Sequence, residues 1–291
     1  MPAMENTQNL TEQHLADAWA TLQAHANKGE NLEPDAYRLA FSDPEFLLRR
    51  EVRGIRMQLE MLKPDLGQSA LGVDNTIVVF GGARFHSPEV AQADLAKAQA
   101  SGDAKALAVA QRLMRTAEYY SQARKFGNLV AEYSKTCASK DKIFICTGGG
   151  PGVMEAANRG AHDMGVPTVG LNIALPHEQS ANPYVTPELS FMFHYFALRK
   201  MHFVMRAKAL VAFPGGFGTL DELFEVLTLV QTGKAKPLPI FLYGSAYWKK
   251  LINFDVLVEE GAISPEDVDL FTYVDDPQTT WNAIKKFYAL A

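Results

Sequence analysis

Short apolar runs alternate with longer stretches whose apolar residues recur every three or four positions from residue 75 onward. Runs that are apolar throughout predict strands covered on both faces, and the longer periodic stretches predict helices. The predicted strands cover residues 76–80, 142–146, 167–173, 208–213 and 238–243. The predicted helices cover 88–138 (as two or three helices), a segment beginning at 153, then 197–207, 219–233, 246–260 and 277–289. This alternation predicts a doubly wound, Rossmann-like α/β domain with a parallel sheet and helices on both faces.

The first part of the chain lacks these strand-like runs and is predicted to be helical. Apolar residues recur at helical spacing at Leu15, Trp19 and Leu22. Ser42 precedes a Pro and is followed three residues later by a Glu, which predicts a capped helix start. That helix is expected to run to about residue 62 and to stop at Pro64. We therefore expect a helical N-terminal extension over 1–70 and a Rossmann-like α/β domain over 71–291.

The helix expected after Ser42 carries several arginines. They are Arg49, Arg50, Arg53 and Arg56. One interpretation is a site for an anion or a partner. The other is a solvated helix face with ion pairs to Glu51 and Glu60, which is how charge runs on helices are most often used.

Composition excludes several classes of protein. The 28 Lys and Arg against 33 Asp and Glu give a net charge of -5, which argues against a nucleic-acid polymer as partner. No apolar run approaches the ~20 residues of a membrane span, and the N-terminus has no basic and apolar leader, so we expect a cytoplasmic protein. The two cysteines, Cys137 and Cys146, form no disulfide framework, and neither a CxxC nor an HExxH motif predicts a metal site.

The 21 glycines are unevenly placed, with clusters at 81–82, 148–152 and 215–218. Each cluster directly follows a predicted strand. Ligands of doubly wound folds bind at the carboxyl ends of strands, where glycine lets the backbone come close to a ligand. A helix that begins just after such a loop offers free N–H groups to an anion. The clusters therefore predict a binding cleft for a phosphorylated ligand.

The cluster at 215–218 gives the strongest signal, because it is followed by Thr219 and Glu222. These two residues predict either a phosphate cradle with a nearby carboxylate or a capping box at the helix start. The segment matches neither a P-loop nor a dinucleotide fingerprint. The cluster at 148–152 predicts a second wall of the cleft or a tight turn. Gly81 and Arg84 follow the first strand, and Arg84 would meet a phosphate or form a surface ion pair.

Arg199 and Lys200 begin the helix that precedes the fourth predicted strand. The apolar residues of this helix predict that it is buried, and a buried guanidinium must find a partner. Glu222 or a ligand phosphate would serve.

Several of these motifs occur in the order and spacing of one known family. The string PGGxGTxxE at 214–222, an Arg-Lys pair 23 residues before its Glu, and the segment TGGGPGVMEAANRGA resemble the Lonely Guy family, of which many members carry the label "possible lysine decarboxylase". The resemblance covers about residues 75–291 and includes YWKKLINFDVLVEEGAI. The N-terminal extension and the helical insertion at 85–120 are similar to the longer bacterial branch.

The resemblance implies a phosphoribohydrolase that cleaves the N-glycosidic bond of a nucleoside 5′-monophosphate, such as AMP or a cytokinin nucleotide, into free base and ribose 5-phosphate. It implies no metal or other cofactor, and a homodimer or a larger homo-oligomer. Arg199 and Glu222 would be the catalytic pair. With the glycine clusters included, the expected substrate-binding residues are Gly81, Arg84, Gly148, Gly149, Gly150, Glu178, Lys200, Gly215, Gly216, Phe217, Gly218, Thr219 and Thr228.

Two positions depart from the family pattern. His177 stands where the family has Arg before the residue that matches Glu178, and Gly-Gly-Ala-Arg at 81–84 replaces the Gly-Ser of many relatives. The main alternative to an enzyme is a nucleotide sensor or carrier that uses the same phosphate loop without catalysis. A decarboxylase would instead need pyridoxal phosphate on a lysine, and an assembly role for the helical extension is a third alternative.

Overall fold

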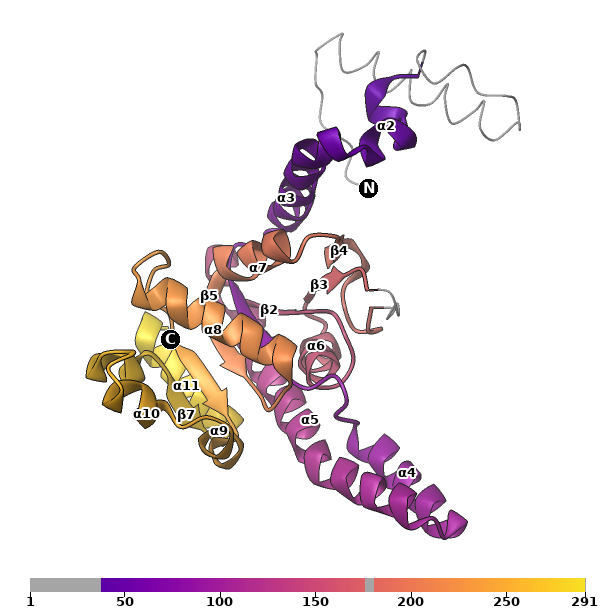
Figure 1. Ribbon diagram of the computed structural model, residues 1–291, viewed down its shortest axis with the longest axis vertical. Coiled ribbons are helices and arrows are strands. Elements are labelled where there is room, and N and C mark those ends of the chain that lie inside the picture. The colour runs from indigo at the N-terminus through magenta and orange to yellow at the C-terminus, as the bar shows by residue number, and fades with distance from the viewer. Residues whose placement is uncertain (1–37, 176–180, 291) are drawn as a thin grey trace. The chain divides into compact units, whose positions relative to one another are not determined.

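The computed structural model describes residues 38–175 and 181–290 of the chain (Figure 1). The chain divides between Leu59 and Glu60 into two compact units. The predicted helices at Leu15, Trp19 and Leu22 lie outside the described residues. The predicted domain boundary after residue 70 stays a prediction.

The described part of the first unit is helical, as expected, but its helices are short. It contains the 3-10 turn η2 (Ala40–Ser42), α2 (Pro44–Leu48), the 3-10 turn η3 (Arg50–Val52) and the start of α3 (Arg53–Ala70). The prediction of one helix from 44 to 62 is therefore wrong. The Arg56 guanidinium donates to the carbonyl oxygens of Leu47 and Arg49, which the break after α2 leaves open.

The cap of α2 also differs from the prediction. The Asp43 carboxylate accepts a hydrogen bond from the N–H of Phe46 at 3.0 Å, while the Ser42 hydroxyl donates backward to the carbonyl oxygen of Leu39. Asp43 is thus the N-cap, and the predicted cap at Ser42 is wrong. Both residue types are good caps, and the chain places the carboxylate one position nearer to the helix.

Helix α3 runs through Pro64, so the predicted stop at this proline is wrong. A proline inside a helix costs about 3 kcal/mol, which tertiary contacts can offset. The buried Gln68 side chain donates to the Pro64 carbonyl oxygen at 3.1 Å. Gly67 lies against the ring of Phe191, where a Cβ would come within 2.8 Å of the ring. The first contact supports the helix beyond the proline, and the second packs the second half of α3 against β4.

The second unit is built on a seven-stranded sheet in the order β4-β3-β2-β1-β5-β6-β7, in which every pairing is parallel. The strands are β1 (Thr76–Phe80), β2 (Phe144–Thr147), β3 (Val169–Ile173), β4 (Ser190–Phe193), β5 (Ala207–Ala212), β6 (Ile240–Tyr243) and β7 (Thr272–Val274). The doubly wound α/β fold is thereby confirmed. The edge strands β4 and β7 were not predicted, because they are short and are neither apolar nor buried throughout.

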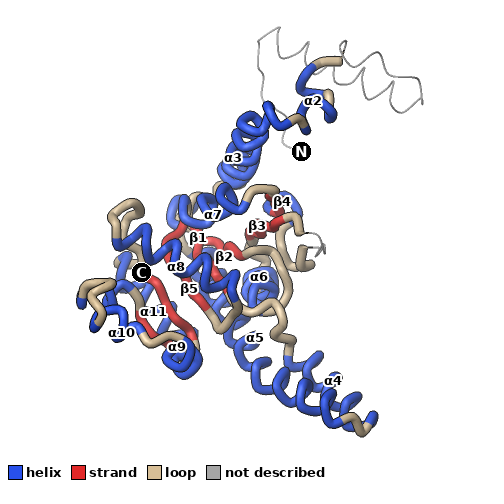
Figure 2. The backbone as a smooth tube through the Cα atoms, in the orientation of Figure 1, coloured by secondary structure: helices blue, strands red, loops and turns tan. Residues whose placement is uncertain are grey.

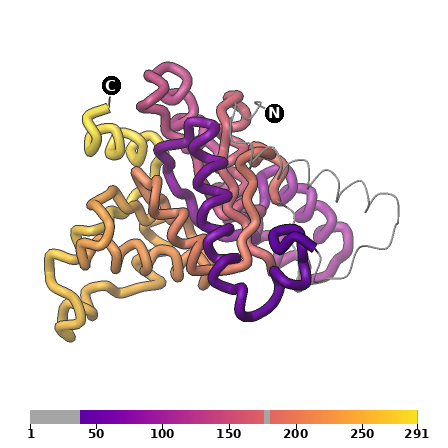
Figure 3. Tube along the Cα trace, turned by 90° about the horizontal axis from the view of Figure 1, so that it is seen from above, coloured from indigo at the N-terminus to yellow at the C-terminus, as the bar shows by residue number. Residues whose placement is uncertain are grey.

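Helices cover both faces of the sheet (Figure 2). The long helices of the sheet domain are α4 (Pro88–Ser101), α5 (Ala104–Thr136), α6 (Val153–Asp163), α7 (Phe196–Met205), α8 (Phe217–Gln231) and α11 (Pro277–Tyr288). The shorter elements are α9 (Ser245–Leu251), α10 (Phe254–Glu259), η4 (Ser139–Asp141), η5 (Pro187–Leu189) and η6 (Pro265–Leu270). The predicted helix over 246–260 is wrong, because Ile252 is extended and Asn253 caps a new helix. Helix α11 packs beside α5 (Figure 3).

The strand order determines where a ligand can bind. The chain winds outward from β1 to β4, and α7 then returns it to β5, which pairs with β1 on the other side. The strand order therefore reverses between β1 and β5. At such a switch point the loops at the carboxyl ends of the two strands diverge and leave a crevice between them.

Helices α5 and α6 approach each other closely at two glycines. A Cβ on Gly127 would lie 2.3 Å from the Ala157 carbonyl oxygen, and one on Gly160 would lie 2.1 Å from the Arg124 carbonyl oxygen. We expect Gly127→Ala to lower the free energy of unfolding by about 2 kcal/mol or more, because the backbones must separate. Thermal and denaturant unfolding measure this change. Gly54→Ala, where a Cβ meets nothing within 4 Å, is the matched control, and equal stability of the two variants would contradict the packing argument.

Candidate active site

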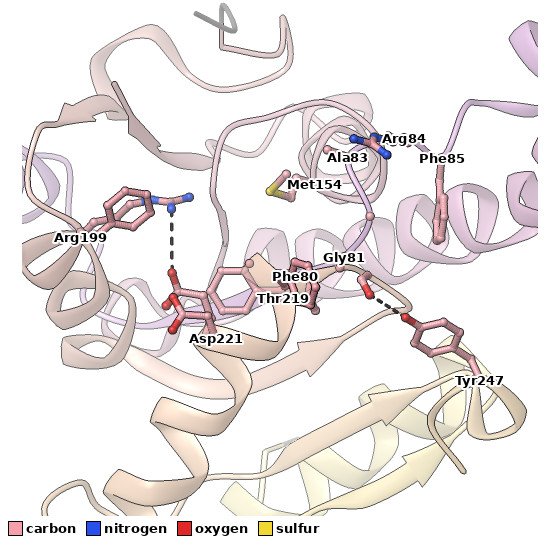
Figure 4. A pocket seen from close by; sticks show the side chains of 17 residues that line it. Phe80, Gly81, Ala83, Arg84, Phe85, Met154, Arg199, Thr219, Asp221 and Tyr247 are labelled. Atoms are coloured by element: carbon pink, nitrogen blue, oxygen red, sulfur yellow. Dashed lines mark hydrogen bonds and ion pairs between the residues drawn. The ribbon is translucent and has the colours of Figure 1, made fainter. Parts of the chain in front are cut away.

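A cleft of about 720 Å³ lies at the carboxyl ends of β1 and β5 (Figure 4). Its walls come from the loops after these two strands and from α6, α7, α8 and α9. The lining residues are Phe80, Gly81, Gly82, Ala83, Arg84, Phe85, Met154, Phe196, Arg199, Gly215, Gly216, Phe217, Gly218, Thr219, Asp221, Glu222 and Tyr247. The glycine clusters after the first and fourth predicted strands thus line one cleft.

Backbone hydrogen bonds hold the two loops together. The N–H of Gly82 donates to the Pro214 carbonyl oxygen at 2.8 Å, continuing the pairing of β1 with β5. The Tyr247 hydroxyl donates to the Gly215 carbonyl oxygen at 2.6 Å (Figure 4). The glycine loop is therefore fixed from both sides before any ligand binds.

Helix α8 begins at Phe217 with Gly216 as its N-cap, and no side chain caps it. The predicted helix start at Thr219 is two residues late, and the capping-box interpretation of Thr219 and Glu222 is wrong. The uncapped first turn leaves amide N–H groups and the positive end of the helix dipole facing the cleft. A Cβ on Gly215 would lie 2.1 Å from the Thr219 hydroxyl oxygen, so the loop needs glycine there.

Arg199 and Glu222 both line the cleft and form an ion pair, and a dashed line leaves Arg199 in Figure 4. The Arg199 Nη1 lies 3.9 Å from the Glu222 Oε1, an ion pair without a direct hydrogen bond. Their side chains are 12% and 8% exposed. Arg199 Nε donates to the Leu171 carbonyl oxygen at 2.7 Å, and the guanidinium lies over the Phe203 ring. The expected partnership of these two residues is thus present in the geometry.

Burial sets the ionisation of this pair. Burial of the Glu222 carboxyl raises its pKa to about 7, against the opposing effect of Arg199 and Lys200. Burial also lowers the pKa of Arg199. A carboxyl group whose pKa lies near neutrality can exchange protons at working pH, as active-site carboxyls do.

The glycine cluster at 148–150 lies against the Arg199 side chain. A Cβ on Gly148 would lie 2.5 Å from Arg199 Nη2, so the absence of a side chain there makes room for the guanidinium. Gly149 has a φ of 70° and its N–H donates to the Thr147 hydroxyl. The Asn182 side chain donates to the Gly150 carbonyl oxygen at 3.0 Å. Direct contact of Gly148, Gly149 and Gly150 with substrate stays a prediction.

Lys200 and Thr228 lie outside the cleft. Lys200 Nζ makes ion pairs with Asp221 at 2.8 Å and Glu225 at 2.7 Å, which tie α7 to α8. Thr228 donates its hydroxyl to the Phe224 carbonyl oxygen and lines a neighbouring groove together with Lys200. A role of either residue in binding substrate stays a prediction.

Arg84 lines the cleft, and no hydrogen bond or ion pair joins it to the described residues. Its side chain is therefore available to an anion, as one of the two sequence interpretations expects. Glu178 lies outside the described residues.

Several lining residues escaped sequence reasoning. Phe85, Met154, Phe196 and Tyr247 carry no chemical motif of their own. Tyr247 could have been found, because it follows β6 and the carboxyl ends of parallel strands share one edge. Phe196 could have been found from its place three residues before Arg199.

The described ranges also lack the features of a metal site and of a membrane span. Residues 38–175 and 181–290 contain no group of three or more His, Cys, Asp and Glu side chains placed to hold a metal ion. Within the same ranges, no helix combines the length and the apolar character needed to cross a membrane.

Comparison with known proteins relates the chain to a family of enzymes. The model of a family described as "Possible lysine decarboxylase" matches residues 154–284. The chain is 30% identical over 151 residues to cytokinin riboside 5′-monophosphate phosphoribohydrolase LOG3 of Arabidopsis thaliana. The aligned segment covers 50% of this chain and 68% of that protein. It is 28% identical over 154 residues to the probable cytokinin riboside 5′-monophosphate phosphoribohydrolase LOG4 of Oryza sativa subsp. japonica. This alignment covers 52% of this chain and 66% of that protein. A shorter segment of 69 residues is 45% identical to LOG1 of Arabidopsis thaliana and covers 23% and 32%.

The matched segments therefore span about two thirds of the first two relatives and about a third of the last. Solved structures resemble the chain more distantly. A molybdenum cofactor binding protein from Rippkaea orientalis has a TM-score of 0.44 and 19% identity, over 74% of this chain and 98% of its own. The Moco carrier protein of Chlamydomonas reinhardtii has a TM-score of 0.46 and 19% identity, over 75% and 99%.

Proposed function

Because the chain belongs to the Lonely Guy family of phosphoribohydrolases, we propose that it hydrolyses the N-glycosidic bond of a nucleoside 5′-monophosphate. The products are the free base and ribose 5-phosphate, and AMP is the proposed first substrate. The observation that carries this proposal is the buried Arg199–Glu222 pair in the same cleft as an uncapped glycine-rich helix start.

The phosphate end of the substrate fits the start of α8. The N–H groups of the first turn and the Thr219 hydroxyl are hydrogen-bond donors suited to phosphate oxygens. Arg84 adds a cation from the opposite loop. Anchoring the phosphate in this way holds the ribose at a fixed distance from Glu222, and such positioning lowers the barrier to reaction.

Glu222 fits the charge that develops in the reaction. Cleavage of an N-glycosidic bond builds positive charge on the ribose ring, as other glycoside cleavages do. An ionised carboxylate beside the ring stabilises that charge and accepts a proton from the attacking water. Arg199 keeps Glu222 oriented, and its own side chain is fixed by the Leu171 carbonyl oxygen.

The decarboxylase description of the matching family model does not fit this cleft. Pyridoxal phosphate chemistry needs a lysine for the Schiff base. None of the described residues that line the cleft is a lysine, and Lys200 is held outside it by two ion pairs.

The pH dependence of the reaction should report Glu222. If the carboxylate form acts, kcat/KM rises with pH through an apparent pKa near 7. Only about one molecule in a hundred is ionised two pH units below that value, so we expect roughly a 100-fold rise between pH 5 and pH 8. Steady-state rates in buffers of constant ionic strength measure the profile. A fall in activity over this range would instead assign Glu222 as a general acid.

A panel of nucleoside monophosphates tests the proposed function. Each is incubated with the purified protein and the products are separated by chromatography. We expect free base and ribose 5-phosphate from at least one purine monophosphate, and no reaction with the matching nucleosides, which lack the phosphate. Binding of nucleotides without release of base from any of them would instead support a sensor or carrier.

A further inference from the structure

Helix α7, which carries Arg199, is held at both of its ends by α3 and the residues just after it. These contacts are made by residues outside the glycine motifs and the Arg-Lys pair. They come from the end of the helical segment that precedes the sheet.

At the start of α7, the Glu60 carboxylate takes the place of a cap. Its two oxygens accept the backbone N–H groups of His194 and Tyr195 at 3.1 Å. Tyr195 is the N-cap of α7 and contributes no capping side chain of its own. A carboxylate at this end satisfies open N–H groups and also interacts favourably with the helix dipole.

At the other end, Arg206 is the C-cap residue of α7 and is anchored in the same segment. Its Nη2 lies 2.7 Å from the Asp65 carboxylate and donates to the Ser69 hydroxyl at 2.9 Å. Its Nε donates to the Val73 carbonyl oxygen at 2.9 Å. The Arg206 side chain is only 11% exposed, whereas its partner Asp65 is 36% exposed.

The middle of the contact is made by the buried His202. Burial lowers the pKa of this imidazole, so the ring is neutral at neutral pH. The ring is influenced by Asp65, Glu60 and Met61 of α3, and neither of its nitrogens has a hydrogen-bond partner among the described residues. The charged contacts between the two segments therefore lie at the ends of α7, where they fix the helix along its axis.

One helical turn connects this anchor with the cleft. Glu60 holds the N–H of Tyr195, and the Tyr195 carbonyl oxygen accepts the N–H of Arg199 at 3.2 Å. The Arg199 side chain must then reach both Leu171 and Glu222. A shift of α7 by a fraction of a turn would break this arrangement.

We propose that Glu60 and Arg206 are positioning residues, which set α7 so that the Arg199 guanidinium stands beside Glu222. This inference rests on the proposed function, since it concerns the same cleft. It gives the segment before the sheet a part in catalysis without any contact with substrate.

A double-mutant cycle tests the proposal. We expect Glu60→Ala to lower kcat by about 10- to 100-fold, because a displacement of this kind misplaces a catalytic group. In an Arg199→Ala background the same change should lower kcat by no more than about twofold, because the side chain that Glu60 positions is already absent. Glu60→Gln, which keeps an acceptor oxygen, should restore part of the activity. Glu132→Ala, at an exposed position of α5, is the matched control and should keep full kcat. Equal losses in both backgrounds would overturn the proposal.

A second readout does not depend on turnover. The groups that face Glu222 are Arg199 and Lys200 from α7 and Asp221 and Glu225 from α8. Displacing Arg199 removes the largest influence that lowers the pKa of Glu222, so this pKa should rise in folded Glu60→Ala and Arg206→Lys. Carbon-13 NMR of the Glu carboxyls follows it. An unchanged Glu222 titration in both folded variants would overturn the positioning role. If the variants shift the Glu222 pKa but the wild-type protein shows no turnover, only the proposed function is refuted.

Discussion

Glu222→Gln is expected to lower kcat on a nucleoside monophosphate by about 1000-fold or more while nucleotide binding survives. The amide has nearly the shape of the carboxyl but carries no negative charge and accepts no proton from water. In the proposed mechanism this buried carboxylate lies beside the ribose, where charge develops, and the start of α8 holds the phosphate. Isothermal titration for binding and chromatography for products measure the two effects separately.

The control for this variant is Glu259→Gln, at an exposed position of α10. It makes the same chemical change away from the cleft and should keep the wild-type kcat. A Glu222→Gln protein with more than about a tenth of the wild-type kcat would show that Glu222 is not the catalytic carboxylate. A loss of binding in parallel with the loss of turnover would assign Glu222 to substrate binding instead.

Gly215→Ala is expected to lower kcat/KM by about 100-fold, mainly through a higher KM. The new methyl group would lie 2.1 Å from the Thr219 hydroxyl oxygen and 2.6 Å from its Cβ. The loop or Thr219 must move to relieve this clash, and the phosphate then loses aligned donors. Steady-state kinetics on the preferred monophosphate, with circular dichroism to confirm the fold, measure the effect.

Gly54→Ala provides the comparison, because the same substitution there meets no atom within 4 Å and lies in α3, outside the cleft. It should leave both kinetic constants unchanged. If Gly215→Ala raised KM no more than Gly54→Ala does, the start of α8 would not be the phosphate anchor.

The sequence was sufficient for the architecture of the sheet domain but not for its edges. Buried strands such as β1 and β5 are apolar throughout, so their pattern is clear. Strand β4 spans only Ser190–Phe193, and its pairing with β3 rather than a local pattern makes it a strand. Local preference predicts a helix end at Pro64, but hydrogen bonds from Gln68 and Arg206 support the helix beyond it.

The chemistry of the cleft followed from residue types, while its geometry did not. The need of a buried arginine for a partner led to the pairing of Arg199 with Glu222. Lys200 follows Arg199 directly, yet neighbouring residues point about 100° apart around a helix, so Lys200 turns to the acidic side of α8. The sequence did not show that Gly148 makes room for the Arg199 guanidinium, because this contact joins segments far apart in the chain.

The central claim is that this cleft breaks the bond between base and ribose. The most direct test is a reaction of AMP with the purified wild-type protein at pH 8, followed by chromatography of every product. We expect adenine and ribose 5-phosphate to appear together in equal amounts, with no release of inorganic phosphate. Recovery of bound AMP intact would show that the cleft does not cleave this bond.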